Sequence, residues 1–152
     1  MDAGAENYKI HERIYDNSTE SKLRLLGYTL LQKLVVLREF NTAYISLSDK
    51  ELNEFNFKSG DTEGVVNYAL SIEGIKLAAF FSEREGIIKI SFRSKDEFSV
   101  KELSTKYFGG GGHKNASGGY SEGSLDDTIK KFLEILPLYK NQLTSKWNCF
   151  LF

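Results

Sequence analysis

The sequence contains little of several residue types, and each shortage excludes a class of protein. Its 152 residues include one cysteine, Cys149, so an internal disulfide is excluded and a reducing, cytoplasmic location is expected. No apolar run approaches the length of a membrane span, and the N-terminal residues lack the apolar centre of a signal peptide, so no membrane partner is expected. The 20 basic and 21 acidic residues nearly cancel. No overall charge therefore attracts nucleic acid, and any basic site must be local.

The spacing of apolar residues and the helix caps predict five helices after the first few residues. Ser48 opens a capping box, Asp61 is expected to cap the next helix, and Ser99 and Ser124 are placed to cap two more. Pro137, the only proline, marks the end or a kink of the last helix. The expected helices are 18–34, 48–55, 61–72, 99–108 and 124–136.

Two stretches have the alternation of β-hairpins. Residues 35–47 alternate on both sides of Asn41, and residues 75–94 contain two β-rich runs around the turn 84–86. The first run of the second hairpin is apolar on both faces, which is typical of a central, covered strand. The expected fold is therefore α/β (α+β mixed), with a single mixed β-sheet flanked by helices and preceded by linker helices.

The chain divides into three expected parts. Residues 1–34 resemble linker helices that remain from a preceding domain, because they have little sheet of their own. Residues 35–140 hold the strands and helices of one domain. Residues 141–152 form an apolar C-terminal tail without an evident partner.

The second run of the 75–94 hairpin has one apolar face and one polar face. The two-residue period separates Ile88, Ile90 and Phe92 from Lys89, Ser91 and Arg93. For Lys89 we favour a solvated face. Arg93 is a stronger candidate for a binding site, because it lies where the strand ends and a loop begins.

The stretch "YFGGGGHKNASGG", residues 107–119, holds six of the 13 glycines. Consecutive glycines can direct several backbone N–H groups toward one point and so hold an anion, and a short helical turn starting near His113 would strengthen that attraction. The alternative is a helix C-cap followed by a loose surface loop. The spacing fits neither a P-loop nor a dinucleotide fingerprint, since Lys114 follows a histidine and a helix precedes the loop.

Three motifs together resemble a known family. The run "GGGGHKNASGG", with "SFRS" about fifteen residues earlier and "DTEGVVNY" further back, is similar to the C-terminal substrate-binding domain of DHH-family phosphoesterases. Within that family the sequence is most similar to the RecJ-like branch of bacterial enzymes that act as oligoribonuclease and phosphoadenosine-phosphate phosphatase. The resemblance spans roughly residues 8–140.

This resemblance implies a two-domain enzyme. An N-terminal domain would carry the Asp-His-His motif and two manganese ions, and the C-terminal domain would hold the substrate across a cleft. The glycine loop and its histidine would hold a phosphate, and the Arg-Ser pair would contact the phosphate or the terminal nucleotide. In this sequence the implied substrate-binding residues are Arg93, Ser94, Gly110, Gly111, Gly112, His113 and Asn115.

The sequence departs from the family in the catalytic half. Its two histidines, His11 and His113, are far apart, and it has no Asp-His-His, Asp-x-Asp or His-x-Asp pattern for a two-metal centre. We therefore expect no catalytic residue, no metal ligand and no cofactor on this chain. It should bind short RNA or a nucleoside 3',5'-bisphosphate without cleaving it, and its partners would be an N-terminal DHH domain and, as a further candidate, a second copy of itself. The alternative is a stand-alone, non-catalytic module that binds nucleic acid or protein.

Overall fold

The computed structural model describes residues 18–145, which form one six-stranded mixed sheet with helices on both faces. The strand order is β1-β2-β3-β4-β6-β5, and only the β2–β3 pair is parallel. The mixed α/β fold predicted from the sequence is therefore confirmed. The strands are β1 Leu34–Leu37, β2 Thr42–Leu47, β3 Leu77–Arg84, β4 Ile87–Ser94, β5 Gly111–His113 and β6 Ala116–Glu122.

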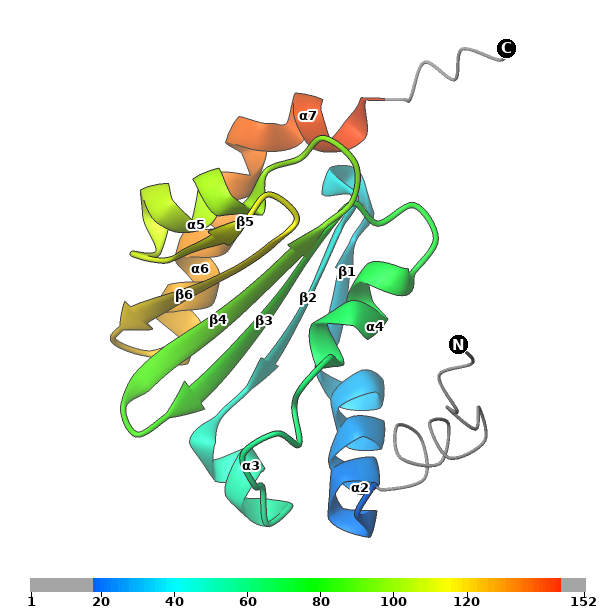
Figure 1. Ribbon diagram of the computed structural model, residues 1–152, viewed down its shortest axis with the longest axis vertical. Helices are drawn as coiled ribbons and strands as arrows, with labels where there is room; N and C mark the ends of the chain where they lie inside the picture. The colour runs from blue at the N-terminus through cyan, green and yellow to red at the C-terminus, as the bar shows by residue number, and fades with distance from the viewer. Residues whose placement is uncertain (1–17, 146–152) are drawn as a thin grey trace, which may run out of the picture.

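The helices gather into two layers, one on each face of the sheet. Figure 1 shows α5, α6 and α7 on one side and α4 on the other, with α2 beside it. The bounds are α2 Glu20–Tyr28, π-helix η1 Thr29–Lys33, 3-10 helix η2 Arg38–Phe40, α3 Asp49–Glu54, α4 Val65–Ser71, α5 Val100–Tyr107, α6 Leu125–Ile135, 3-10 helix η3 Leu136–Tyr139 and α7 Lys140–Thr144. Among these elements, no helix is long and apolar enough to cross a membrane.

Strand β3 carries a core on each face, as its apolar alternation predicted. Leu77, Ala79 and Phe81 pack into the core under α5, α6 and α7. Ala78 and Phe80 pack into a second core with α2, α3 and α4. The two hairpins are also confirmed: β1 and β2 pair antiparallel around Asn41, which adopts a left-handed conformation, and β3 pairs antiparallel with β4.

The helix caps are confirmed at three of the four expected positions. Ser48, Ser99 and Ser124 each accept a hydrogen bond from the backbone N–H three residues later. The cap expected at Asp61 is wrong. The helix begins four residues later, after Gly64 in a left-handed conformation, while the Asp61 carboxylate accepts from the backbone N–H of Lys58 within a tight turn.

The segment 18–34 forms two kinds of helix and then enters the sheet. Thr19 caps α2, which changes to the π-helix η1 at Thr29, and Leu34 already belongs to β1. Leu25 of α2 is fully buried in the second core. The described part of the expected linker is therefore packed against the domain. His11 lies outside the described residues.

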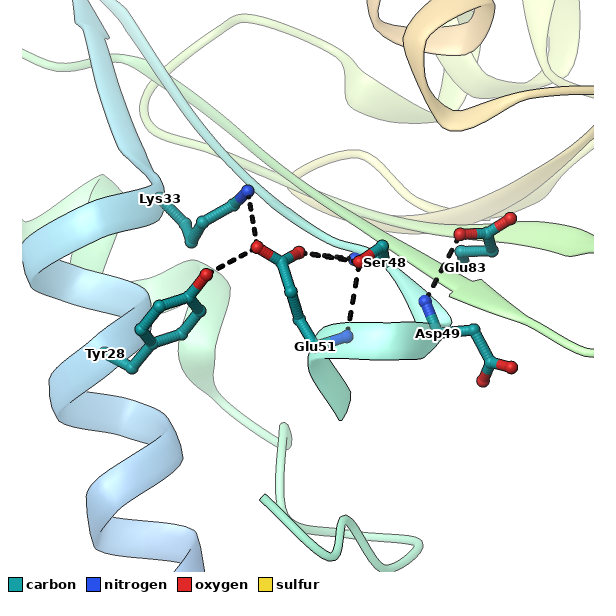
Figure 2. A network of polar contacts seen from close by, with 6 residues as sticks. All are labelled: Tyr28, Lys33, Ser48, Asp49, Glu51 and Glu83. Carbon is teal, nitrogen blue, oxygen red and sulfur yellow. Dashed lines mark hydrogen bonds and ion pairs between the residues drawn. The ribbon is translucent and has the colours of Figure 1, made fainter. Parts of the chain in front are cut away.

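Figure 2 shows the polar network that fastens this segment to α3. The Glu51 carboxylate accepts hydrogen bonds from the Tyr28 hydroxyl (2.5 Å), from the backbone N–H of Ser48 (2.9 Å) and from Lys33 Nζ (2.8 Å). Burial alone would raise the pKa of Glu51, but these donors outweigh it and hold the pKa at about 2. The hydrogen bond to Glu51 in turn raises the pKa of Tyr28 to about 12.

The far end of the described chain is also packed. Leu143 of α7 is fully buried in the larger core, and its carbonyl accepts from the Asn41 side chain at 2.9 Å. The Lys76 ammonium donates to the Ser145 carbonyl at 2.7 Å. Packing thus continues past residue 140, where the tail was expected to begin. Cys149 lies outside the described residues.

Candidate anion-binding site

The glycine stretch forms a β-hairpin, not a loop that leads into a helical turn. Gly111–His113 is an edge strand, and it returns through Lys114 and Asn115 into β6. A helical turn near His113, which would have strengthened the attraction for an anion, does not form. Pairing with β6 holds β5 extended, and β6 in turn pairs with the long strand β4.

The register of these three strands places two of the expected site residues in one row. His113 pairs with Ala116, and Ala116 pairs with Arg93. Paired residues point to the same face of a sheet, so Arg93 and His113 share a face and stand on either side of a small residue. Two strand spacings separate their backbones, about 10 Å, which long side chains on this face can span.

The neighbouring row on the same face is almost bare. Gly111 pairs with Gly118, and Gly118 pairs with Ser91. We call these two rows the glycine platform: Ser91, Arg93, Gly111, His113, Ala116 and Gly118. In Figure 1, α5 and α6 lie behind this part of the sheet and α4 lies over β2 and β3, so no helix of the described chain covers the front of β6 and β5.

The three glycines expected to bind phosphate have different roles. A Cβ on Gly110 would lie 1.9 Å from the Gly118 carbonyl oxygen, and one on Gly112 would lie 2.6 Å from the Ala116 carbonyl oxygen. Both positions therefore require glycine for packing. Gly111 is exposed and a Cβ there would meet nothing within 4 Å, so packing does not explain its lack of a side chain.

Ser94 and Asn115 lie apart from the platform and hold the turn together. Ser94 follows Arg93 in the strand, so it faces the opposite side of the sheet, where it is buried. Its hydroxyl donates to the Phe98 carbonyl at 2.7 Å and accepts from the Asn115 amide at 3.0 Å. The structure therefore brings Arg93, Gly111 and His113 together on one face, and it gives Ser94 and Asn115 structural contacts instead.

A polar pocket of about 280 Å³ adjoins the platform at Ser91 and Arg93. The loop before α4 forms its other wall, where Gly60 and Gly64 have positive φ angles of 99° and 77°. Its remaining lining residues are Ser59, Thr62, Glu63, Val66, Phe80, Ser82, Arg84 and Lys89.

The charge of this polar pocket is mainly positive. Arg84, Lys89 and Arg93 line it against one acidic residue, Glu63. Within residues 18–145, the ion pairs are Arg24–Glu20, Lys33–Glu51 and Lys114–Glu97, so none of the three bases of the pocket takes part in one. Unpaired basic side chains around a polar cavity favour an anionic ligand.

Sequence reasoning missed one of these bases. Lys89 is exposed, as expected for a solvated face, and it also shares that face with Arg93 and lines the same pocket. Arg84 was noted only as part of a turn. The two-residue period places Arg84 on the same face as Ser82, and Ser82 pairs with Lys89 on the neighbouring strand. The alternation of the strand therefore already indicated that Arg84 and Lys89 share a face. The wall formed by residues 59–64 had no such signal.

A second groove, of about 870 Å³, runs between β5 and α5 on the outer edge of the hairpin. Gly112 and His113 line it together with Lys101 and Lys106. Lys114 lines it too, but that ammonium is paired with Glu97. His113 thus stands between the glycine platform and this outer groove.

Metal ligands do not gather in the described part of the chain. Residues 18–145 contain no group of three or more His, Cys, Asp or Glu side chains that could hold a metal ion.

The sheet, its two helical layers and the glycine hairpin together define a mixed α/β domain. The DHHA1 domain family matches residues 38–138, and the chain belongs to that family. The resemblance based on the glycine–histidine run is therefore confirmed at the level of the family.

Named relatives share the domain across part of their length. The bifunctional oligoribonuclease and PAP phosphatase NrnA of Thermus thermophilus is 35% identical over 77 residues, which are 50% of this chain and 22% of that protein. The crystal structure of an exopolyphosphatase-related protein from Bacteroides fragilis matches with a TM-score of 0.89 and 39% identity, over 93% of this chain and 42% of that one. The chain thus spans less than half the length of either relative.

A more distant structure agrees in fold. The pGpG-specific phosphodiesterase PggH of Vibrio cholerae matches with a TM-score of 0.55 and 15% identity, over 92% of this chain and 53% of that one. This similarity supports the arrangement of the sheet and its helices.

Proposed function

We propose that this chain is the substrate-binding part of a DHH-type phosphoesterase, and that it holds a phosphate of a short oligoribonucleotide or a nucleoside 3',5'-bisphosphate on the glycine platform. The observation that carries the proposal is the row in which Arg93 and His113 flank Ala116 on one face, beside the bare row of Gly111 and Gly118. A phosphate needs charged donors around it and a surface that it can approach closely, and this face has both.

Each part of the platform has a distinct task in this proposal. The Arg93 guanidinium pairs with two phosphate oxygens, a geometry that a planar fork of donors favours. The imidazole of His113 donates to the same group from the edge strand. Gly111 and Gly118 leave the backbone bare between them, so the phosphate or the adjoining ribose can lie against the sheet without meeting a side chain.

The class of substrate is supported by the family and by one relative. The name of the NrnA relative from Thermus thermophilus combines an oligoribonuclease with a PAP phosphatase. An enzyme with both activities must recognise what the two substrates share, which is a phosphate on a ribonucleotide. The described residues offer no metal centre. We therefore assign cleavage, and the manganese ions that would support it, to a separate DHH domain.

The first experiment measures binding by the 152-residue chain. An NMR titration with adenosine 5'-monophosphate and with a 5'-phosphorylated RNA dinucleotide should shift the backbone amides of residues 91, 93, 111 and 113. Binding should weaken as salt increases, because phosphate contacts release counterions. Arg93→Gln should weaken binding about tenfold or more, since hydrogen bonds to charged groups contribute about 1.5–3 kcal/mol. His113→Gln should weaken it less.

Gly111→Ala separates a binding role from a structural one. The added methyl group meets nothing in the protein, so the melting temperature should change little, whereas a ligand lying against the platform would meet it. The matched control is Gly27→Ala on α2, where a Cβ also meets nothing within 4 Å. If Gly111→Ala and Gly27→Ala bind nucleotide equally well, the platform is not the contact surface. Manganese-dependent turnover by the chain alone would contradict the assignment of cleavage to another domain.

A further inference from the structure

Arg84, at the end of β3, is held in the polar pocket by neutral groups. Its Nε donates to the Ser82 hydroxyl at 2.9 Å, and its Nη2 donates to the Thr62 hydroxyl at 2.7 Å. The guanidinium carbon lies 4.5 Å from the centre of the Phe57 ring. These contacts orient the side chain, and the ring and hydroxyls surround it without supplying a negative charge.

A half-buried cation without a counter-charge is costly to maintain. Burial lowers the pKa of Arg84, which shows that the surroundings disfavour its charge. The ion pairs within residues 18–145 do not include it. A guanidinium has five N–H donors, and the two hydroxyls use only part of them, so donors remain for an oxyanion.

Lys89 adds a second charge at the same end of the polar pocket. Its backbone pairs with Ser82, the residue whose hydroxyl holds Arg84, so Lys89 and Arg84 line one wall. The facing wall is the loop of Thr62 and Glu63. Glu63 is exposed and forms no ion pair with either base, so the net charge at this end stays positive.

The Arg84 end of the polar pocket lies far from the glycine platform along the strands, but the same pocket reaches both. Arg84 pairs with Ile87 and Arg93 pairs with Ala78, which places the two arginines six residues apart along the β3–β4 ladder, about 20 Å between backbones. Both side chains nevertheless line the same pocket of about 280 Å³. Arg84 and Arg93 therefore line this pocket at opposite ends.

We propose that Arg84 and Lys89 form a second phosphate subsite, so that the site prefers ligands with two phosphate groups over those with one. The first phosphate lies at Arg93 on the platform, and in this respect the inference rests on the proposed function. The second phosphate neutralises Arg84, which the fold orients without a carboxylate partner among residues 18–145. A nucleoside bisphosphate or a phosphorylated dinucleotide carries two such groups, whereas a nucleoside monophosphate carries one.

The test compares adenosine 3',5'-bisphosphate with adenosine 5'-monophosphate on the 152-residue chain by calorimetry at low salt. The unaltered chain should bind the bisphosphate about tenfold more tightly. Lys89→Gln should reduce that preference several-fold and leave the affinity for the monophosphate within about twofold. Arg84→Lys, which keeps the charge but loses the planar fork, should act in the same direction. The matched control is Lys130→Gln, an exposed lysine on α6, which should change neither affinity.

The outcomes separate this inference from the proposed function. A preference for the bisphosphate that survives in both Lys89→Gln and Arg84→Lys, or no preference in the unaltered chain, overturns the second subsite. If the monophosphate does not bind and the amides of 91, 93, 111 and 113 do not shift, the proposed function fails instead. Inorganic phosphate then decides the second subsite alone: shifts at 62, 84 and 89 that Lys89→Gln removes support it, and their absence overturns it.

Discussion

Removing the Glu51 carboxylate should destabilise the domain more than removing any exposed carboxylate, because it joins two parts of the chain. It accepts hydrogen bonds from Tyr28 and Lys33 on the N-terminal helical segment and from Ser48 at the start of α3 (Figure 2). The Glu51 side chain is 16% exposed, so solvent screens these contacts only in part. Glu51→Gln keeps the shape of the side chain and removes its charge.

The pKa of Glu51 bounds the size of the effect. A fall from the ordinary value of 4.5 to about 2 corresponds to at most about 3–4 kcal/mol of preference for the charged form in the folded state. After allowance for screening we expect Glu51→Gln to cost about 1–2 kcal/mol at neutral pH. For a domain of this size that is a fall in melting temperature of roughly 4–8 °C.

The pH dependence gives the sharper test. The pKa of Glu51 is lower in the folded chain than in the unfolded chain, so its contribution is complete above about pH 4.5 and is lost as the pH falls toward 2. Urea unfolding of the unaltered chain and of Glu51→Gln should therefore differ most at pH 7, differ by less than half as much at about pH 3, and converge at about pH 2. Glu54→Gln, an exposed carboxylate one turn away on α3, is the control. The reasoning is refuted if both variants lose the same stability, or if the loss in Glu51→Gln is as large at pH 3 as at pH 7.

Two further predictions concern the hairpin that carries the platform. Gly110→Ala should prevent folding or lower the melting temperature sharply, because its Cβ would lie 1.9 Å from the Gly118 carbonyl oxygen, whereas Gly27→Ala should leave the melting temperature unchanged or higher. Asn115→Ala should cost about 1–2 kcal/mol in urea unfolding, since it removes the amide that donates to the Ser94 hydroxyl and to neighbouring carbonyls; an unchanged unfolding midpoint would show that these bonds contribute nothing.

Local patterns in the sequence predicted the centre of the sheet well. The one-faced apolar run of β4 sets which of its residues face the core, and the double-faced apolar run of β3 marks a strand that is covered on both sides. The caps at Ser48, Ser99 and Ser124 follow from side-chain chemistry within one turn of a helix. The strand periods and the helix caps depend on residues that are close together in the chain, so they can be predicted from the sequence alone.

The glycine hairpin could not be predicted in the same way. Glycine has low intrinsic preference for strands, and Gly111–His113 is extended because β6 pairs with it, which is a tertiary effect. The family resemblance implied that Arg93 and Ser94 both contact the substrate. The two-residue period argues against it, because adjacent residues of a strand face opposite sides, and the structure follows the period.

Arg84 shows a different limit of sequence reasoning. Its place on the polar face follows from the period of β3, but its partner Thr62 comes from a loop without regular structure. That loop was expected to be the first turn of a helix capped by Asp61. A glycine in a left-handed conformation, Gly64, delays the helix and leaves the preceding residues free to form a wall of the polar pocket. No local signal distinguishes these two outcomes, since Asp61 is a good cap residue in either case.

The bare front of the hairpin depends on what holds it from behind. Strands rich in glycine are weak, because they have no side chains to pack and lose more backbone entropy on folding. Here α5 supplies the missing contacts on the rear face: the Ser104 hydroxyl donates to the Gly118 carbonyl, the Ser117 hydroxyl donates to the Val100 carbonyl at 2.8 Å, and the Tyr120 N–H donates to the Phe108 carbonyl at 2.9 Å. Because α5 holds the hairpin from the rear and β4 pairs with it along one edge, Gly111 and Gly118 need no packing partner on the front. A ligand that needs close approach to the backbone requires a surface built in this way.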